Sequence, residues 1–330
     1  MSDTRYDILA IGNAIVDVIA NTDDEFLAGE QLTKGAMELV DEARAQELYS
    51  AMDSAREISG GSAANTLAGL AMLGRKCALV AQVADDPLGE IFSHDIRAAG
   101  IDFDVTPRAG DPATARCLIF VTPDAQRTMN TFLGASQYLP AAALDKELIQ
   151  SAEILYLEGY LWDPEAPRAA MRGAIDYAKA AGRKVAFTLS DGFVIDRFRD
   201  DFMALINEGL IDILFANEDE IQSLTQNDSF DAAVDMIAAK LPLLVVTRGA
   251  NGAIAVQDGT RYSVAAQPVS QLVDTTGAGD LFAAGFLSGL SEGRDIDSCL
   301  KAGAVCAAEI ISHYGARPEA DIKALVAKAL

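Results

Sequence analysis

The 330-residue chain has only two histidines and four cysteines. The histidines show no metal-ligand spacing and the cysteines contain no C-x-x-C pair, so the sequence predicts neither a zinc site nor a disulfide framework. We expect all four thiols to be buried, at Cys77, Cys117, Cys299 and Cys306. Because a hydrolytic triad needs a histidine base, the scarcity of histidine argues against that class of enzyme. A proton acceptor in this protein is therefore expected to be a carboxylate.

Basic residues are also scarce, with 26 Lys and Arg against 49 Asp and Glu and a net charge of −23. Such a chain repels the phosphate backbone of nucleic acids, so no nucleic-acid partner is expected. Purely apolar runs are short, as at 241–246, and none is long enough to span a bilayer. The N-terminal stretch is a poor signal peptide, so we expect a cytoplasmic protein with no membrane partner.

The signatures of three common nucleotide-binding classes are missing from the sequence. It contains no G-x-x-x-x-G-K-[ST] motif and no Gly-Lys pair, which excludes a P-loop kinase. Protein-kinase motifs are missing as well. Gly12-Asn13-Ala14, after the first predicted strand, does not match the G-x-G-x-x-G of nicotinamide enzymes.

The chain does have a regular alternation of apolar strands and helical patterns. The pattern predicts strands at 153–158, 184–189, 211–216 and 243–247, and then a hairpin at 253–264. Repeated βα units predict an α/β fold with a mostly parallel central sheet flanked by helices on both faces.

The stretch 101–133 differs from the rest of the chain. Its alternation, β-branched residues and turn signals predict a small antiparallel piece rather than a βα unit. We predict one α/β core with a small β-sheet lid. The core would comprise residues 1–14, 40–101 and 134–330, and the lid would comprise 15–39 and 102–133.

The most informative segment is Asp274-Thr275-Thr276-Gly277-Ala278-Gly279-Asp280, which precedes an apolar helical pattern. The small residues let backbone N–H groups approach an anion, and the helix N-terminus adds partial positive charge. We expect Gly277, Ala278 and Gly279 to form an anion hole. Asp280, kept ionised by the helix terminus, would accept a hydroxyl proton during phosphoryl transfer. The alternative is an ordinary N-terminal acid after a glycine turn.

Two further groups of small and polar residues lie near the N-terminus. Gly60 and Gly61 open a helix and permit close contact with a ligand, and Asn65 lies one turn later on the same side. The alternative is a tight turn capped by the serine that follows. Asn13 and Asp17 flank the end of the first strand, where a carboxylate is a good acceptor for a diol. The alternative there is a simple strand-end turn.

Polar residues also follow two later strands. Asn217 and Glu220 lie one turn apart and are suited to hold the hydration shell of Mg²⁺. Thr247, Arg248 and Gly249 follow the next strand and are suited to contact nucleotide phosphates. Since ligands of open α/β sheets bind outside the carboxyl ends of the strands, these positions favour a binding role over helix capping.

At this point the sequence resembles a known family. GGSAANTLAGLAMLG (60–74) and DTTGAGDLFAAGFL (274–287) look like the two signatures of the PfkB, or ribokinase-like, carbohydrate kinases. N-x-x-E at 217–220 and T-x-G at 247–249 occur in the family's order, and the resemblance covers essentially the whole chain. It implies an ATP:alcohol phosphotransferase with a Rossmann-like core and a β lid, using ATP and Mg²⁺.

The resemblance also implies roles for individual residues. Asp280 would be the base, Gly277 to Gly279 the anion hole, and Asn217 with Glu220 the Mg²⁺ neighbourhood. Thr247 and Gly249 would lie at the nucleotide, and the acceptor hydroxyls would meet Asp17, Gly60, Gly61 and Asn65. Asp274 and Thr276 resemble the monovalent-cation loop, which binds K⁺ in those members that use one.

Several stretches look most like the adenosine kinase branch of the family. They are GNAIVDV (12–18), the hairpin at Arg127 followed by LGAS, EGYL (158–161), TLSDGF (188–193) and VDTTGAGD. The substrate-binding residues implied by this branch include Arg127 and two aromatics, Tyr160 and Phe193, which are suited to stack on a base. The glycine-rich helix start, in contrast, has more of the sugar-kinase character.

We therefore expect a kinase that phosphorylates a hydroxymethyl group of a small-molecule nucleoside or sugar. Adenosine, phosphorylated at its 5′-OH to AMP, is the leading acceptor, and a sugar such as ribose or fructose is the alternative. A third reading is a catalytically silent binding protein on the same fold. The assembly is expected to be a monomer or a homodimer.

Overall fold

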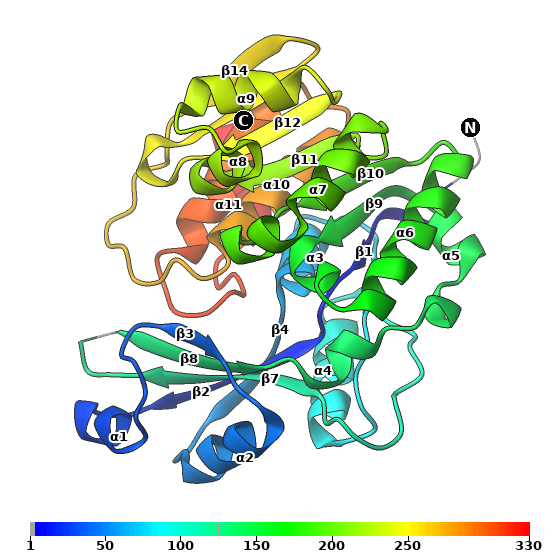
Figure 1. Ribbon diagram of the computed structural model, residues 1–330. Coiled ribbons are helices and arrows are strands. Elements are labelled where there is room, and N and C mark those ends of the chain that lie inside the picture. The colour runs from blue at the N-terminus through cyan, green and yellow to red at the C-terminus, as the bar shows by residue number, and fades with distance from the viewer. Residues whose placement is uncertain (1–3, 125) are drawn as a thin grey trace.

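The computed structural model describes residues 4–124 and 126–330, and its larger sheet runs through the upper part of the molecule (Figure 1). Residues 1–3 and Ala125, which fall within the predicted core and lid ranges, lie outside the described part. The larger sheet has nine strands in the order β14-β13-β12-β11-β10-β9-β1-β5-β6. Neighbouring strands from β12 to β6 are parallel, and β13 and β14 add an antiparallel hairpin.

The predicted strands of the core are confirmed with small changes at their ends. In chain order the strands of the larger sheet are β1 (Tyr6–Ile11), β5 (Cys77–Val80), β6 (Ile101–Asp102), β9 (Ala152–Glu158), β10 (Lys184–Thr188), β11 (Ile213–Asn217), β12 (Leu243–Thr247), β13 (Ala253–Gln257) and β14 (Thr260–Val264). Apart from the edge strands β14 and β6, these strands are mostly buried, as expected for a sheet covered on both faces.

Helices cover both faces because successive side chains of each strand point to opposite sides. Ile8 and Ala10 of β1 face one apolar core, and Leu9 and Ile11 face another. The first core is covered by α3 (Ser62–Met72), α4 (Pro87–Ala98), α10 (Ala278–Ser291), α11 (Ile296–Ile310) and α12 (Ile322–Ala329). The second is covered by α5 (Lys146–Gln150), α6 (Glu165–Ala180), α7 (Gly192–Asn207), α8 (Glu218–Thr225) and α9 (Phe230–Ala238). The predicted α/β architecture is therefore confirmed, and all four cysteines are buried as expected.

A second sheet of five strands lies below the first in Figure 1, in the order β3-β8-β7-β2-β4. Its strands are β2 (Ile15–Asn21), β3 (Met37–Leu39), β4 (Arg56–Gly60), β7 (Ala115–Val121) and β8 (Arg127–Phe132), and it is accompanied by α1 (Asp24–Gly29) and α2 (Glu42–Ala51). The antiparallel piece predicted within 101–133 is confirmed, because β7 pairs antiparallel with β8. The sheet as a whole is mixed, since β2 pairs with β7 and β3 pairs with β8 in parallel.

The predicted boundary at residue 40 also needs correction. β4 was placed in the core range, but it pairs antiparallel with β2, with Ile15 opposite Gly60. β4 therefore belongs to the smaller sheet, and it ends directly before α3 of the core. In the opposite sense, β6 begins the predicted lid range but pairs with β5 of the larger sheet.

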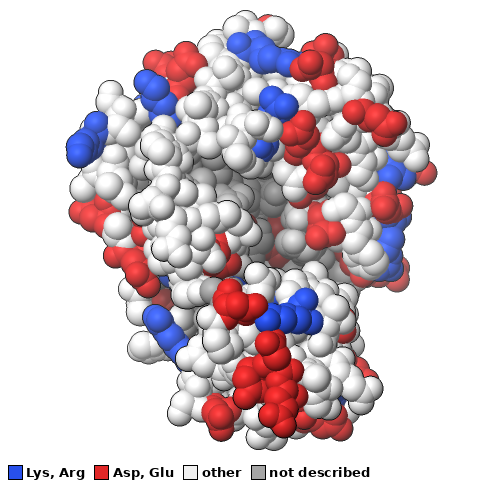
Figure 2. All heavy atoms as spheres, turned by 90° about the vertical axis from the view of Figure 1, so that its left-hand side faces the viewer, with Lys and Arg blue, Asp and Glu red and all other residues white. Residues whose placement is uncertain are grey.

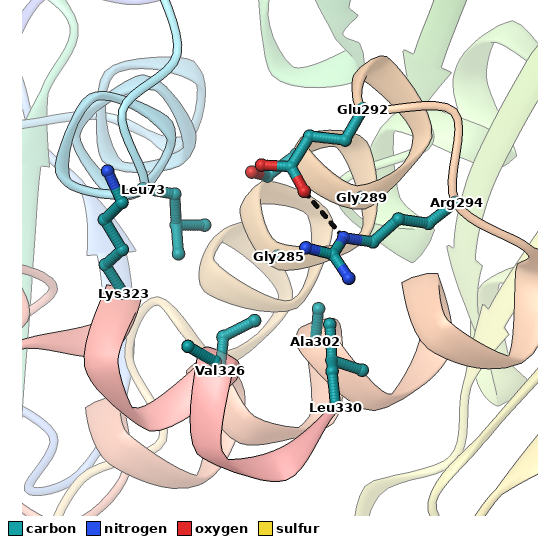
Figure 3. A pocket seen from close by; sticks show the side chains of 11 residues that line it. Leu73, Gly285, Gly289, Glu292, Arg294, Ala302, Lys323, Val326 and Leu330 are labelled. Atoms are coloured by element: carbon teal, nitrogen blue, oxygen red, sulfur yellow. Dashed lines mark hydrogen bonds and ion pairs between the residues drawn. The ribbon is translucent and has the colours of Figure 1, made fainter.

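Helices α10 and α11 pack closely through small residues. A Cβ added to Gly285 would lie 2.4 Å from the carbonyl oxygen of Ala302, so the two backbones approach almost without side chains between them. Figure 3 shows both residues beside a pocket of about 110 Å³ that α12 closes, with Glu292 bonded to Arg294 nearby. This pocket lies toward the C-terminal end of α10.

No helix in the described part of the chain is long and apolar enough to cross a membrane.

We predict that Gly285→Ala lowers the free energy of unfolding by about 1–3 kcal/mol, because the new methyl group overpacks the contact with Ala302. Gly173→Ala on α6 is the matched control, since its Cβ would come no closer than 3.9 Å to Leu144. That variant should gain up to about 1 kcal/mol from helix propensity. Urea unfolding monitored by circular dichroism measures both, and equal effects of the two substitutions would contradict the packing argument.

Candidate active site

The N-terminus of α10 is an open helix tip. Gly277 precedes it with φ +78°, and in the described part of the chain no side chain caps the helix. A Cβ added to Gly279 would enter open space, whereas one at Gly277 would lie 2.9 Å from Ala316. The N–H of Ala278 bonds to the carbonyl of Thr275 (3.2 Å). The remaining N–H groups of the first turn and the positive end of the helix dipole together suit an anion.

Asp280 joins this tip to the start of α3. It accepts hydrogen bonds from the Ser62 hydroxyl (2.6 Å) and from Nδ2 of Asn65 (3.0 Å). Burial raises the pKa of Asp280, while these two bonds and the charge of Arg317 oppose the rise. We expected the helix terminus to dominate and keep the residue ionised; in the structure burial is the largest effect, and hydrogen bonds stabilise the carboxylate.

The other predicted residues of the α3 start lie close to the strand ends. Gly61 has φ +95°, and a Cβ there would lie 2.4 Å from the carbonyl oxygen of Asn13. At Gly60 a Cβ would lie 2.6 Å from Oδ2 of Asp17, so the glycine lets this carboxylate lie against the turn. The structure thus brings Asn13, Asp17, Gly60 and Gly61 together.

Asp17 reaches the core from the smaller sheet. Burial raises its pKa to about 6, with Arg127 and Arg317 acting in the opposite direction and Asp274 and Asp280 adding to the rise. Asp17 and Asp280 are therefore close enough for each to affect the other's charge. Two carboxylates, one from the smaller sheet and one from the core, are suited to bind the hydroxyls of a polyol.

Glu158 is a central residue that the sequence analysis missed. It ends β9, is 0% exposed, and accepts hydrogen bonds from the backbone N–H and Nδ2 of Asn13 (2.7 and 2.6 Å). Its other oxygen accepts the N–H of Ala63 (2.7 Å). Burial raises its pKa to about 7 against the effect of these three bonds. Glu158 is a polar residue at the end of the apolar strand AEILYLE, just as Asn217 is at the end of a later strand. The same pattern could therefore have identified Glu158 from the sequence.

Arg127 and Asp274 form an ion pair between the smaller sheet and the core. Asp274 also accepts hydrogen bonds from the N–H and hydroxyl of Thr276 (3.0 and 2.8 Å) and from the N–H of Gly315 (3.0 Å). Although burial raises the pKa of Asp274, these N–H donors and the guanidinium hold it below its ordinary value. A carboxylate held by hydrogen-bond donors and a guanidinium does not fit a monovalent cation, so the structure gives the expected K⁺ site at Asp274 and Thr276 no support.

Asn217 and Glu220 form a reciprocal capping box at the start of α8. Oδ1 of Asn217 accepts the N–H of Glu220 (2.8 Å), and the Glu220 carboxylate accepts the N–H and Nδ2 of Asn217 (3.0 and 2.7 Å). Burial raises the pKa of Glu220 to about 7, and the charges of Asp191 and Asp219 raise it further. Among the described residues, no three His, Cys, Asp or Glu side chains cluster to ligate a metal. The described residues thus give no set of direct ligands for Mg²⁺ here, and the side chains of the pair bond to each other.

The residues predicted to contact phosphates at the end of β12 differ from one another in their surroundings. Thr247 lies beside Asn217 in the sheet register, and Gly249 follows with φ +52°. Arg248, however, is paired with Glu218 (3.2 Å) and its guanidinium lies 4.1 Å from the centre of the Phe230 ring. A phosphate at Arg248 would have to compete with Glu218.

A pocket of about 550 Å³ lies between the loop 267–270 and α11. Its walls are residues 267–270 and the helix α11 side chains Val305, Ala308 and Glu309. The N–H of Val273 bonds to the carbonyl of Ile311 (2.9 Å), which links the loop before the tip to the end of α11. The pocket has the size of a small-molecule site. The pocket could not be predicted from the sequence because its lining, half polar and half apolar, comes from separate segments that form no recognisable motif.

Tyr160 and Phe193 follow the neighbouring strands β9 and β10. They are exposed by 39% and 55%, which is unusual for large aromatic side chains in this chain. Burial of its hydroxyl raises the pKa of Tyr160, and the charges of Asp191 and Asp280 add to the effect. The Tyr160 hydroxyl therefore senses the charges of Asp191 and Asp280. Figure 2 shows the molecule hollowed above its smaller lobe, with acidic side chains on both parts.

We predict that Glu158→Gln weakens the dependence of stability on pH. The pKa of Glu158 rises from its ordinary 4.5 to about 7 in the fold, so its ionisation destabilises the native state and stability falls as the pH rises between these values. The amide group of the variant also lowers stability at all pH values, because its NH₂ would face the N–H of Ala63. This loss does not depend on pH, so the slope of stability against pH reports the charge of Glu158 alone. Urea unfolding at several pH values measures this slope, and equal slopes in the two proteins would contradict the prediction.

Comparison with known proteins agrees with this geometry. A model of the pfkB family carbohydrate kinases matches residues 6–323. The adenosine kinase from Sinorhizobium meliloti is 46% identical, with a TM-score of 0.91 over 99% of this chain and 100% of that one. A protein from Rhizobium etli CFN 42 named as a probable sugar kinase is 45% identical, with a TM-score of 0.92 over 99% of each chain. The 5-dehydro-2-deoxygluconokinase of Shouchella clausii is 28% identical over 98% of this chain and 96% of its own. The chain belongs to the pfkB family of carbohydrate kinases and is a phosphotransferase.

Proposed function

We propose that this kinase transfers the γ-phosphoryl group of ATP to a primary hydroxyl, with the 5′-OH of adenosine as the leading acceptor. The observation that carries the transfer is the position of Asp280. It lies in the first turn of an uncapped helix whose tip opens at Gly279, and it is bonded to Ser62 and Asn65. An anion site and a carboxylate base thus lie within one helical turn.

The phosphates of ATP would lie at the tip of α10, and the nucleobase would occupy the pocket walled by 267–270 and α11. Thr247 and Gly249 lie at the carboxyl end of β12, where the triphosphate of ATP would pass. Asn217 and Glu220 would hold the water shell of Mg²⁺, which supplies positive charge to the phosphates when bound. In a protein of net charge −23, the helix terminus and this cation offset the phosphate charge.

The acceptor hydroxyl would be placed between Asp17 and Asp280. As the oxygen of the acceptor forms its bond to phosphorus, the bond from phosphorus to the leaving ADP oxygen breaks. The hydroxyl proton passes to a carboxylate oxygen of Asp280, and the tip N–H groups stabilise the charge on the migrating group. Ser62 and Asn65 hold Asp280 in place, and Glu158 fixes Asn13 and the start of α3.

The smaller sheet would act as a lid over this reaction. It brings Asp17 to the acceptor, and its strand β8 carries Arg127, which is paired with Asp274 of the core. A closed lid excludes water, which would otherwise compete as acceptor. The proposed division into a core and a lid follows the two sheets, with β4 counted in the lid.

Exposed aromatics support a nucleoside acceptor. Tyr160 and Phe193 follow adjacent strands at the edge that carries the site, and exposed rings there are suited to stack on a base. The 46% identity to the Sinorhizobium meliloti adenosine kinase supports the same reading. The similar identity to the Rhizobium etli protein keeps a sugar as the second candidate acceptor.

We predict that Asp280→Asn lowers kcat by about 10²–10⁴-fold, because the amide cannot accept the hydroxyl proton. ATP binding and the unfolding midpoint should change little. Asp231→Asn in the first turn of α9, where the carboxylate meets Arg261 at the surface, is the matched control. A coupled ADP-release assay measures turnover, and wild-type kcat in D280N would refute the role of Asp280.

We predict that adenosine protects the fold against heating far more than ribose does. A ligand at 100 times its Kd stabilises the native state by about 2.7 kcal/mol. Phe193→Ala should reduce the protection by adenosine, whereas Met236→Ala, an equally exposed apolar site on α9, should leave it unchanged. Thermal unfolding with each compound is the measurement. Greater protection by ribose or fructose than by adenosine would favour the sugar kinase.

A further inference from the structure

Arg317 lies in the segment that follows α11, beside the helix tip. The preceding residue, Ala316, is the one that a Cβ at Gly277 would meet. One guanidinium nitrogen donates to the carbonyl oxygen of Ala64 (2.9 Å), and the other donates to the carbonyl oxygen (2.8 Å) and hydroxyl (3.1 Å) of Ser59. These acceptors flank the Gly60-Gly61 turn on both sides. Arg317 thus ties the end of β4 in the smaller sheet to the start of α3 in the core.

The charge of Arg317 faces the carboxylates of the acceptor site. Asp17, Asp280 and Asp95 are the groups whose negative charge it balances, and desolvation lowers its pKa only to about 10, so it stays a cation at neutral pH. Arg127 also faces Asp17, but its guanidinium is paired with Asp274.

The surroundings of Asp280 show why this cation matters. Ser62 and Asn65 on α3 donate hydrogen bonds to Asp280, and Arg317 approaches it from the C-terminal segment. The remaining titratable groups that sense its charge, from β2, β9 and the turn after β9, are Asp17, Glu158, Tyr156 and Tyr160. Each of these is neutral or negative, so Arg317 is the positive group in this set.

We propose that Arg317 is a positioning residue for the phosphoryl acceptor site, which clamps the Gly60-Gly61 turn and lets Asp17 and Asp280 both be carboxylates there. The inference rests on the proposed phosphoryl transfer for its effect on activity. Its structural part, the clamp of the Gly60-Gly61 turn, stands on the hydrogen bonds of Arg317 alone.

The test is Arg317→Gln, which removes the charge and keeps a polar side chain of similar width. Without the cation the pKa of Asp280 rises, so the low-pH limb of kcat/KM for the acceptor moves to higher pH. A displacement of about 1 pH unit lowers kcat/KM about ten-fold on that limb. KM for ATP should stay within about two-fold, because the clamp holds the acceptor side.

Two further variants separate charge from packing. Arg317→Lys retains the charge and should keep the limb within about 0.3 pH unit of the wild type, while its single ammonium weakens the clamp and raises KM for the acceptor. Arg199→Gln is the matched control, since Arg199, like Arg317, donates to a backbone carbonyl (Ser223, 3.1 Å). Its guanidinium also bonds to Asp196 (2.6 Å), and these contacts join α7 and α8. The low-pH limb of kcat/KM in the Arg199→Gln variant should not move.

A second readout does not depend on turnover. In protein labelled with ¹³C at the aspartate carboxyl carbon, the Asp280 resonance is assigned from its loss in Asp280→Asn and titrated by NMR. It should titrate at higher pH in Arg317→Gln than in the wild type. If R317Q does not fold, R317K carries the test, and a limb displaced upward in R317K would overturn the inference.

The outcomes distinguish the two proposals. A wild-type protein that phosphorylates no alcohol from ATP would refute the proposed function, and the NMR titration would still decide the role of Arg317. A wild type that is active, together with an unmoved limb and an unmoved Asp280 titration in R317Q, would overturn the Arg317 inference and leave the kinase intact.

Discussion

Two helix N-termini meet at buried carboxylates, and the arrangement of the site depends on this contact. Asp280 lies in the first turn of α10 and is held by Ser62 and Asn65 of α3. Glu158 binds the N–H of Ala63 at the same end of α3 and fixes Asn13 at the end of β1. Positive helix ends stabilise these charges, but burial raises the pKa of both groups. The site is therefore poised between charged and neutral carboxyl groups.

The acidic character of the chain opposes the ionisation of these carboxyl groups. With a net charge of −23, the protein gathers Asp17, Glu158 and Asp280 around one space before any phosphate arrives. Hydrogen-bond donors, helix termini and a few guanidinium groups offset the repulsion. The Arg127–Asp274 pair and the Arg317 clamp both join the smaller sheet to the core. The same contacts that balance charge thus set how the two sheets meet.

Much of the fold could be predicted from the sequence, because the βα alternation is periodic and local. The strands β9 to β12 and the hairpin after them are where the apolar pattern placed them. The pairing of β4 with β2 could not be predicted, since it joins segments about 40 residues apart and depends on the glycine turn that follows β4. For the same reason the lid boundary at residue 40 was wrong.

The candidate site could be predicted where residue type and position relative to a strand or helix end coincide, as at Asp280, Gly60 and Asn217. The ion-pair partners of the site residues were harder to predict than the site residues themselves. Nothing in the sequence indicated that Arg127 would pair with Asp274, or Arg248 with Glu218, and these pairings change what the arginines and the Asp274 loop can bind. Arg317 lies in a short segment without a recognisable motif, and only its position in the fold shows its contacts.

The most direct test of the account is a crystal structure with ADP, Mg²⁺, adenosine and aluminium fluoride, which mimics the migrating phosphoryl group. The account predicts the fluoride complex at the N–H groups of Gly277 to Gly279, with the acceptor hydroxyl within hydrogen-bond reach of the Asp280 carboxylate. Aluminium fluoride bound away from this helix tip, or an acceptor hydroxyl that points away from Asp280, would contradict it.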